Sequence, residues 1–155
     1  MTARLNYAKV ASGGYQAMSQ LEQYVRNSGL EPSLLELVKI RASQINGCAF
    51  CIDMHTKDAR AAGESEQRIY LLSAWREAPF YSERERAALE WAEALTLIAE
   101  NHVPDEIFER VKPHFSDEEL VNLSLAITTI NAWNRLAIGF RSEPGTYQPR
   151  QSVAH

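Results

Sequence analysis

The sequence predicts an all-α protein, a single helical domain of six or seven helices over residues 1–155. Two observations support this fold class: apolar residues recur at helical spacing, and Gly or Pro closes most of the periodic segments. No segment is convincing as a strand. The chain has 155 residues, 45% hydrophobic and 23% charged. A chain of this length can bury about 70% of its unfolded surface, so it needs no disulfide or metal in order to fold.

Seven segments carry the helical pattern: 12–29, 31–47, 48–63, 65–78, 82–101, 104–115 and 116–140. The first three each end in a glycine, at Gly29, Gly47 and Gly63. Glycine commonly follows a helix because it adopts the left-handed backbone at little cost. Pro79 closes the fourth segment, since proline cannot continue a helix.

The last three segments begin with N-terminal signals. Ser82-x-x-Glu85 and Ser116-x-x-Glu119 are capping boxes, in which the serine and glutamate side chains satisfy free backbone amides. Pro104 lies in the first turn of the segment between them, a position that proline favours. These signals predict three separate helices in this half of the chain.

The segment 116–140 contains the β-branched run AITTI, which could form a strand. We expect a helix because the helical period continues through this run and the cap is explicit. Asn131, Asn134 and Arg135 are costly in an apolar helix unless they are paired, so we expect them in a satisfied core or an interface. The tail 142–155 is rich in Pro, Ser and Gln and is expected to be loose.

Charge and hydropathy exclude several kinds of partner. The formal net charge is −4, and the absence of a basic stripe argues against nucleic acid and anionic membranes as partners. No apolar segment resembles a secretory signal or a membrane span. We therefore expect a cytoplasmic protein, and in the cytoplasm a Cys-x-x-Cys is more often catalytic or metal-binding than structural.

Both cysteines of the chain lie in the stretch GCAFCIDMH, with Cys48, Cys51 and His55 at positions i, i+3 and i+7 of an expected helix. That spacing places all three on one face. Cα atoms three residues apart on a helix are about 5 Å apart, which a disulfide tolerates. Cys48 and Cys51 can therefore open and close a disulfide with little backbone movement.

The position of the cysteines at the start of the expected helix favours a reactive thiol. An ordinary thiol with a pKa of about 8.5 is only about 3% thiolate at pH 7, and lowering that pKa by two units makes it about three-quarters thiolate. A helix N-terminus favours the anion, and His55 can accept the proton of Cys51. Only the thiolate attacks a peroxide or a disulfide.

Two other interpretations of these residues remain open. The cysteines could simply be buried packing residues, although His55 would be an unusual core neighbour. Alternatively, Cys48, Cys51 and His55 could hold zinc, but a structural zinc site needs four ligands, and the other histidines show no paired ligand spacing. We predict neither a metal nor a cofactor.

Glu36 is the fourth candidate residue. Ser33-x-x-Glu36 has the spacing of a capping box, and from spacing alone a cap is the favoured interpretation. If the helices before and after Gly47 pack together, Glu36 could instead face His55 and orient it.

The run from Glu36 through Cys48, Cys51 and His55 resembles the core motif of alkyl hydroperoxidase D-like proteins, within the carboxymuconolactone decarboxylase-like superfamily. The resemblance covers most of the chain. It implies an all-helical fold that assembles into dimers, trimers or hexamers. It favours the relay over the cap for Glu36.

The resemblance also implies an activity, the reduction of organic hydroperoxides in antioxidant defence. By this resemblance, Cys51 is the nucleophile, Cys48 resolves the sulfenic acid into a disulfide, and Glu36 and His55 form a proton relay. A lipoyl or thioredoxin-like protein is expected to restore the dithiol.

The chain departs from the family pattern at Phe50, where the best-studied type of member has a second histidine. The relay then has one imidazole fewer in a more apolar pocket, so the activity could be weaker or the substrate different. A general dithiol/disulfide oxidoreductase acting on a partner protein remains an alternative, and an oligomeric module with structural zinc remains a further one.

Overall fold

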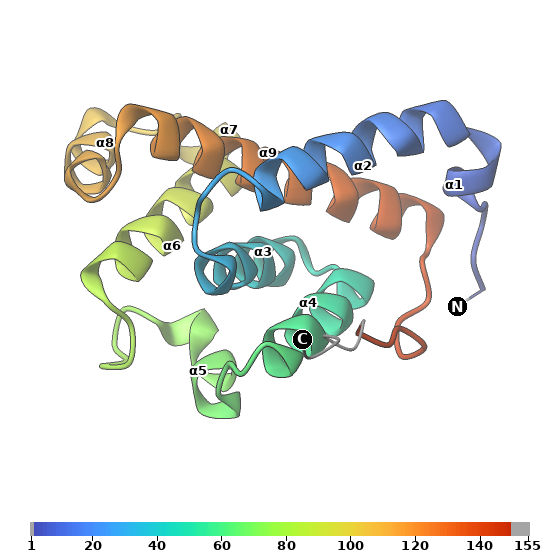
Figure 1. Ribbon diagram of the computed structural model, residues 1–155, viewed down its shortest axis with the longest axis horizontal. Coiled ribbons are helices and arrows are strands. Elements are labelled where there is room, and N and C mark those ends of the chain that lie inside the picture. The colour runs from blue at the N-terminus through green and yellow to red at the C-terminus, as the bar shows by residue number, and fades with distance from the viewer. Residues whose placement is uncertain (1, 150–155) are drawn as a thin grey trace.

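The computed structural model describes residues 2–149 and confirms the all-α class, because no strand occurs within that range (Figure 1). The α-helices are α1 (Tyr7–Val10), α2 (Ser12–Arg26), α3 (Pro32–Asn46), α4 (Ala49–Ala61), α5 (Glu66–Tyr70), α6 (Glu83–Thr96), α7 (Ile98–Asn101), α8 (Asp105–Val111) and α9 (Asp117–Phe140). Two short 3₁₀ turns cover Leu72–Ala74 and Lys112–His114.

Helix α3 lies at the centre of the molecule and packs against α4, α6 and α9, while α2 runs alongside α9 (Figure 1). Its residues are buried on every side, including Leu35, Leu37, Val38 and Ile40. The charged residues of α3 are paired instead of lying on a solvent-exposed face: Lys39 is buried and binds Glu22, and Arg41 binds Glu93. A helix with apolar residues on all sides and paired charged ones suits a central position.

The N-terminal signals of the two long helices in the second half are confirmed. Ser82 and Glu85 form a complete capping box at α6, and Ser116 and Glu119 form another at α9. Both glutamates also bind arginines from elsewhere: Arg68 contacts Glu85, and Arg84 contacts Glu119. The helix caps thus also hold neighbouring elements together.

Three expected helices are shorter than predicted, and the simplest case is 104–115, where α8 ends at Val111 and a 3₁₀ turn follows. The other two are broken by side chains. The segment 82–101 is interrupted at Leu97, where the Asn101 side chain donates to the carbonyls of Ala94 and Leu97. The segment 65–78 forms only α5 and a 3₁₀ turn, because the guanidinium of Arg86 binds the carbonyls of Trp75, Arg76 and Ala78. In both places side-chain donors replace helical hydrogen bonds.

Among the helices of residues 2–149, none combines the length and the apolar character needed to cross a membrane.

Candidate active site at the start of α4

The turn between α3 and α4 delivers both cysteines to one place. Gly47 has a left-handed backbone with φ of 70°, and the amide of Cys48 donates to the Ser43 carbonyl at 3.0 Å. A left-handed glycine followed by such a bond ends a helix and reverses the chain. Helix α4 therefore folds back on α3, with Cys48 as its N-cap residue.

Cys48 and Cys51 are joined by a disulfide, with their Cα atoms 5.3 Å apart. This distance matches the one expected from helical spacing. The Cys48 sulfur also accepts a hydrogen bond from the Cys51 amide at 3.3 Å. The N-cap position thus places a sulfur where a first-turn amide without an intrahelical partner points, and such a site favours negative charge.

The disulfide is enclosed by apolar side chains. Cys48 and Cys51 are only 1% and 2% exposed. Phe50 and Trp133 are partly buried and pack against the same cluster, whose buried members include Ile130 of α9. A molecule that reaches the sulfurs must therefore displace or pass an apolar surface.

His55 lies one turn after Cys51 on the same buried face of α4. Its Nδ1 atom is 2.9 Å from Oε2 of Glu36 on α3, so the two helices bring these residues together across the Gly47 turn. Burial acts to raise the pKa of Glu36, but the His55 hydrogen bond and the nearby charges of His55, Lys39 and Arg26 lower it below its usual range. Glu36 is held as a carboxylate facing the imidazole.

The capping interpretation of Glu36 is wrong. Glu31 is the N-cap residue of α3 and Pro32 is its first residue, so Ser33 lies inside the helix and cannot cap it. Proline favours the first helical position because its fixed φ suits the helix and it lacks an amide hydrogen. The Pro32 signal outweighs the Ser33-x-x-Glu36 spacing.

Asp58 and Tyr147 lie beside the Glu36–His55 pair. We call these four residues, Glu36, His55, Asp58 and Tyr147, the acid–base cluster. Asp58 lies three residues after His55, and donor atoms of Glu36, His55 and Asp58 all lie within 4.8 Å of one another. The Tyr147 hydroxyl donates to Oδ1 of Asp58 at 2.7 Å. The i, i+3 spacing of His55 and Asp58 could have indicated Asp58, but no local signal indicates Tyr147.

Tyr147 comes from the tail that was expected to be loose. Within its described part, residues 142–149, the Gly145 amide donates to Oδ2 of Asp53 at 2.9 Å, and Lys57 Nζ donates to the Tyr147 carbonyl at 3.0 Å. We call this segment the C-terminal strap. The remainder of the expected tail, 150–155, lies outside the described residues.

The donor types of Glu36, His55 and Asp58 could bind a metal ion. We assign none, because Glu36 and His55 already bond to each other, and Asp58 accepts from Tyr147. Cys48 and Cys51 offer no thiolates to zinc while they form a disulfide.

A second polar group, the amide cluster, lies along α3 and α9 and includes Ser43, whose carbonyl accepts the Cys48 amide. It consists of Ser43, Asn46, Asn131 and Asn134. Asn46 Nδ2 donates to Oδ1 of both Asn131 and Asn134 at 2.9 Å, and Asn134 Nδ2 donates to Ser43 Oγ at 3.0 Å. Of the two expected environments for the asparagines of α9, the structure shows the satisfied core.

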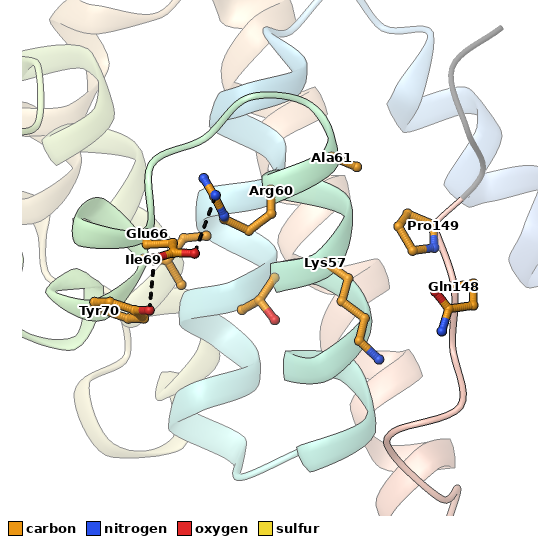
Figure 2. Close-up of a pocket in the computed structure, with 9 residues that line it drawn as sticks. Lys57, Arg60, Ala61, Glu66, Ile69, Tyr70, Gln148 and Pro149 are labelled. Atoms are coloured by element: carbon orange, nitrogen blue, oxygen red, sulfur yellow. Dashed lines mark hydrogen bonds and ion pairs between the residues drawn. The ribbon is translucent and has the colours of Figure 1, made fainter.

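An open groove of about 670 Å³ lies between α4, α5 and the strap, with Lys57, Arg60, Tyr70 and Pro149 among its lining residues (Figure 2). Arg60 and Glu66 pair within it at 3.4 Å. None of the four predicted site residues lines this groove. We therefore do not identify it with the site at the disulfide.

The protein is a small helical domain with a Cys-x-x-Cys disulfide at a helix N-terminus and a Glu–His pair one turn away. These are features of the class of small helical proteins that carry a dithiol/disulfide site. The chain belongs to the carboxymuconolactone decarboxylase family, whose model matches residues 13–94. Its structural neighbours make it an AhpD-like member of that family.

The similar proteins agree with this placement. YdfG, an uncharacterized protein of Bacillus subtilis, is 51% identical over 138 residues, covering 89% of this chain and 94% of YdfG. The crystal structure of ATU0492 from Agrobacterium tumefaciens has a TM-score of 0.91 and 53% identity, covering 94% of this chain and all of that one. ATU0492 is a protein of unknown function, named as a candidate AhpD antioxidant defence protein.

A shorter match reaches a protein with a named activity. The alkyl hydroperoxide reductase AhpD of Bradyrhizobium diazoefficiens is 42% identical over 45 residues, which cover 29% of this chain and 25% of that protein.

Proposed function

We propose that this protein is a thiol-dependent peroxidase that reduces organic hydroperoxides through the Cys48–Cys51 pair. One observation carries the proposal: a disulfide at the N-terminus of α4 is followed, one turn later, by an imidazole paired with a carboxylate. Together they supply a nucleophile, a resolving thiol and a proton carrier. The described state corresponds to the oxidised form of this cycle.

The proposed cycle begins with the reduced pair. The Cys51 thiolate attacks the terminal oxygen of the hydroperoxide, the O–O bond breaks, and Cys51 becomes a sulfenic acid while the alkoxide takes up a proton and leaves as an alcohol. The Cys48 thiolate then attacks the Cys51 sulfur, and the sulfenic hydroxyl takes up a proton and leaves as water. The resulting disulfide is the one described above.

His55 and Glu36 are the proposed proton carriers. His55 lies one turn from Cys51, and Glu36 fixes which ring nitrogen faces the carboxylate. The other nitrogen, Nε2, is then available to take the Cys51 proton and return it to the alkoxide. The carboxylate stabilises the imidazolium that forms between those two steps.

The surroundings of the disulfide support an apolar substrate. Phe50 and Trp133 pack at the cysteine cluster. The apolar part of an organic hydroperoxide gains free energy when it leaves water for such a surface, and hydrogen peroxide has no apolar part. A dithiol carried by a lipoyl or thioredoxin-like protein is the proposed reductant, supplying two electrons to reopen the disulfide. We place this cycle in the cytoplasm, where such reductants operate.

A homo-oligomer is also proposed. Exposed apolar side chains lie on α1, α2 and α9, among them Val10, Tyr15, Val121 and Ile138, and contact with a second copy would remove such side chains from water. Sedimentation of the purified protein would contradict this proposal if it gave a monomer at micromolar concentration.

The test is turnover with cumene hydroperoxide and a dithiol reductant. We expect Cys51→Ser to abolish turnover, and Cys48→Ser to consume one equivalent of peroxide and then stop with a sulfenic acid that dimedone traps. Ala49→Ser, an exposed position of the same turn, is the matched control and should keep wild-type turnover. Full activity in either cysteine variant would exclude the proposed cycle.

A second candidate, a dithiol/disulfide oxidoreductase acting on a partner protein, is favoured by one observation. Cys48 is the N-cap residue, and its sulfur accepts the hydrogen bond from the Cys51 amide. Thiols at a helix N-terminus are typical nucleophiles in disulfide exchange, so Cys48 would be the attacking residue in this second function. If Cys51→Ser forms a stable mixed disulfide through Cys48 with a partner, while the wild type reacts with peroxide no faster than free cysteine, this second function replaces the first.

A further inference from the structure

The C-terminal strap is fastened to α4 by its backbone. The Gly145 amide and the Tyr147 carbonyl bond to Asp53 and Lys57, respectively, and Asp53 and Lys57 also pair with each other at 3.0 Å. Figure 2 shows Gln148 and Pro149 of the strap beside α4, to the right of Lys57. These contacts hold the strap without any contribution from the Tyr147 hydroxyl.

The Tyr147 hydroxyl instead points away from that fastening and into the acid–base cluster. It donates to Asp58 at 2.7 Å, and a carboxylate oxygen of Asp58 lies within 4.8 Å of the Glu36 and His55 donor atoms. The cluster therefore joins α3, α4 and the strap, three parts of the chain that are far apart in sequence.

The phenol remains a donor wherever thiol chemistry takes place. Burial raises the pKa of Tyr147 to about 12, assisted by the hydrogen bond to Asp58 and by the negative charges of Asp58 and Glu36. The Tyr147 hydroxyl is thus protonated between pH 5 and 9, and over that whole range it donates a hydrogen bond that partly neutralises the charge of the Asp58 carboxylate.

We propose that Tyr147 is a positioning residue of the reaction site: through its hydrogen bond it holds Asp58 and moderates the charge that Asp58 presents to the Glu36–His55 pair. This inference rests on the proposed function for its role in catalysis. It adds the C-terminal strap to the site, and it assigns Asp58 as the residue through which Tyr147 acts.

The proposal predicts two shifts of opposite sign in the titration of the His55 ring. The groups that face this cluster are Glu36 on α3, Asp58 on α4 and Tyr147 on the strap, and the charges of Arg26 on α2 and Lys39 on α3 act on Glu36. Removing the Asp58 charge withdraws support from the imidazolium. Removing the phenol leaves the Asp58 carboxylate without its hydrogen-bond donor, so its full charge stabilises the imidazolium.

The experiment follows the ring nitrogens of His55 by NMR as a function of pH, with the disulfide intact and His55→Asn used for assignment. We expect Asp58→Asn to lower the titration midpoint by about one pH unit. Tyr147→Phe should raise it. The double variant should match Asp58→Asn alone, because the phenol acts only through Asp58.

Asp53→Asn is the matched control, since it removes a negative charge from the same helix but keeps an oxygen that can accept the Gly145 amide and hold the strap. The residue lies two positions from His55, a spacing that puts the two side chains on different faces of the helix. We expect the control to leave the midpoint unchanged. An unchanged midpoint in Tyr147→Phe, an equal rise in Asp53→Asn, or additive shifts in the double variant would each overturn the proposal.

The titration involves no peroxide, so it separates this inference from the proposed function. In a single-turnover reaction with cumene hydroperoxide, Tyr147→Phe should displace the pH profile of Cys51 oxidation, while Asp53→Asn should not. A wild type that fails to react but shows the predicted titration shifts would refute the peroxidase and leave the positioning role of Tyr147 intact. A reactive wild type without those shifts would do the reverse.

Discussion

Two polar clusters adjoin the buried disulfide, and they differ in what they can do. The acid–base cluster contains two carboxylates, an imidazole and a phenol. The amide cluster contains three asparagines and a serine. Both join elements that are distant in sequence, and each combines buried with partly buried side chains. Only the first can gain or lose protons between pH 4 and 12, so burial alone does not distinguish a reaction site from a structural one.

The amide cluster instead fixes geometry. Asn134 is fully buried and joins α9 to α3 through Asn46 and Ser43. Asn131 extends the cluster to α6 through Thr96 Oγ1 at 3.0 Å. Neutral amides satisfy each other without a charge that burial would penalise, so this cluster can align α3 and α9 around the disulfide at every pH.

The largest expected effect that separates the clusters is on turnover. We expect His55→Asn to lower peroxide turnover per folded molecule by about 10²–10⁴-fold, the usual contribution of a general acid–base group. Steady-state kinetics measures the turnover, and urea unfolding gives the folded fraction by which it is corrected. A variant that keeps more than half of the wild-type turnover would remove the functional difference between the two clusters.

The next largest effect is on stability and concerns the amide cluster. Asn134→Leu should lower the free energy of unfolding by about 2–3 kcal/mol, because it leaves polar groups of Asn46 and Ser43 with fewer partners in a buried place. Turnover per folded molecule should stay close to wild type. Thr128→Ala, at an exposed position of the same helix, is the control. A stable Asn134→Leu variant with lost turnover would make the amide cluster part of the chemistry.

The smallest effect is the pH dependence of stability from Glu36. Its pKa is lower in the folded protein than in the unfolded chain, so its contribution is present above the unfolded value and is lost as the pH falls through the folded value. Because Glu36 is partly exposed, water screens this contribution. Wild type and Glu36→Gln should differ in urea midpoint at pH 7 and converge near pH 2. A constant difference across that range would show that Glu36 stabilises by packing alone.

Local signals predicted the parts of the site that lie within a few residues of one another. The spacing of Cys48 and Cys51, the glycine stop at Gly47 and the helical position of His55 all follow from the geometry of one turn and one helix. Local signals fail where a side chain from another element binds the backbone carbonyls of a helix. Arg86 does this at the end of the fourth expected helix, where it binds the carbonyls of Trp75 and Ala78.

The sequence by itself determined an all-α chain, two capping boxes and a Cys-x-x-Cys pair within disulfide reach, because each depends only on neighbours along the helix. Only the tertiary structure decided that Glu36 faces His55, that Tyr147 reaches Asp58 from 89 residues away, and that both sulfurs are buried. Those contacts depend on how α3, α4 and the strap pack, and helical periodicity does not encode which distant side chains will meet.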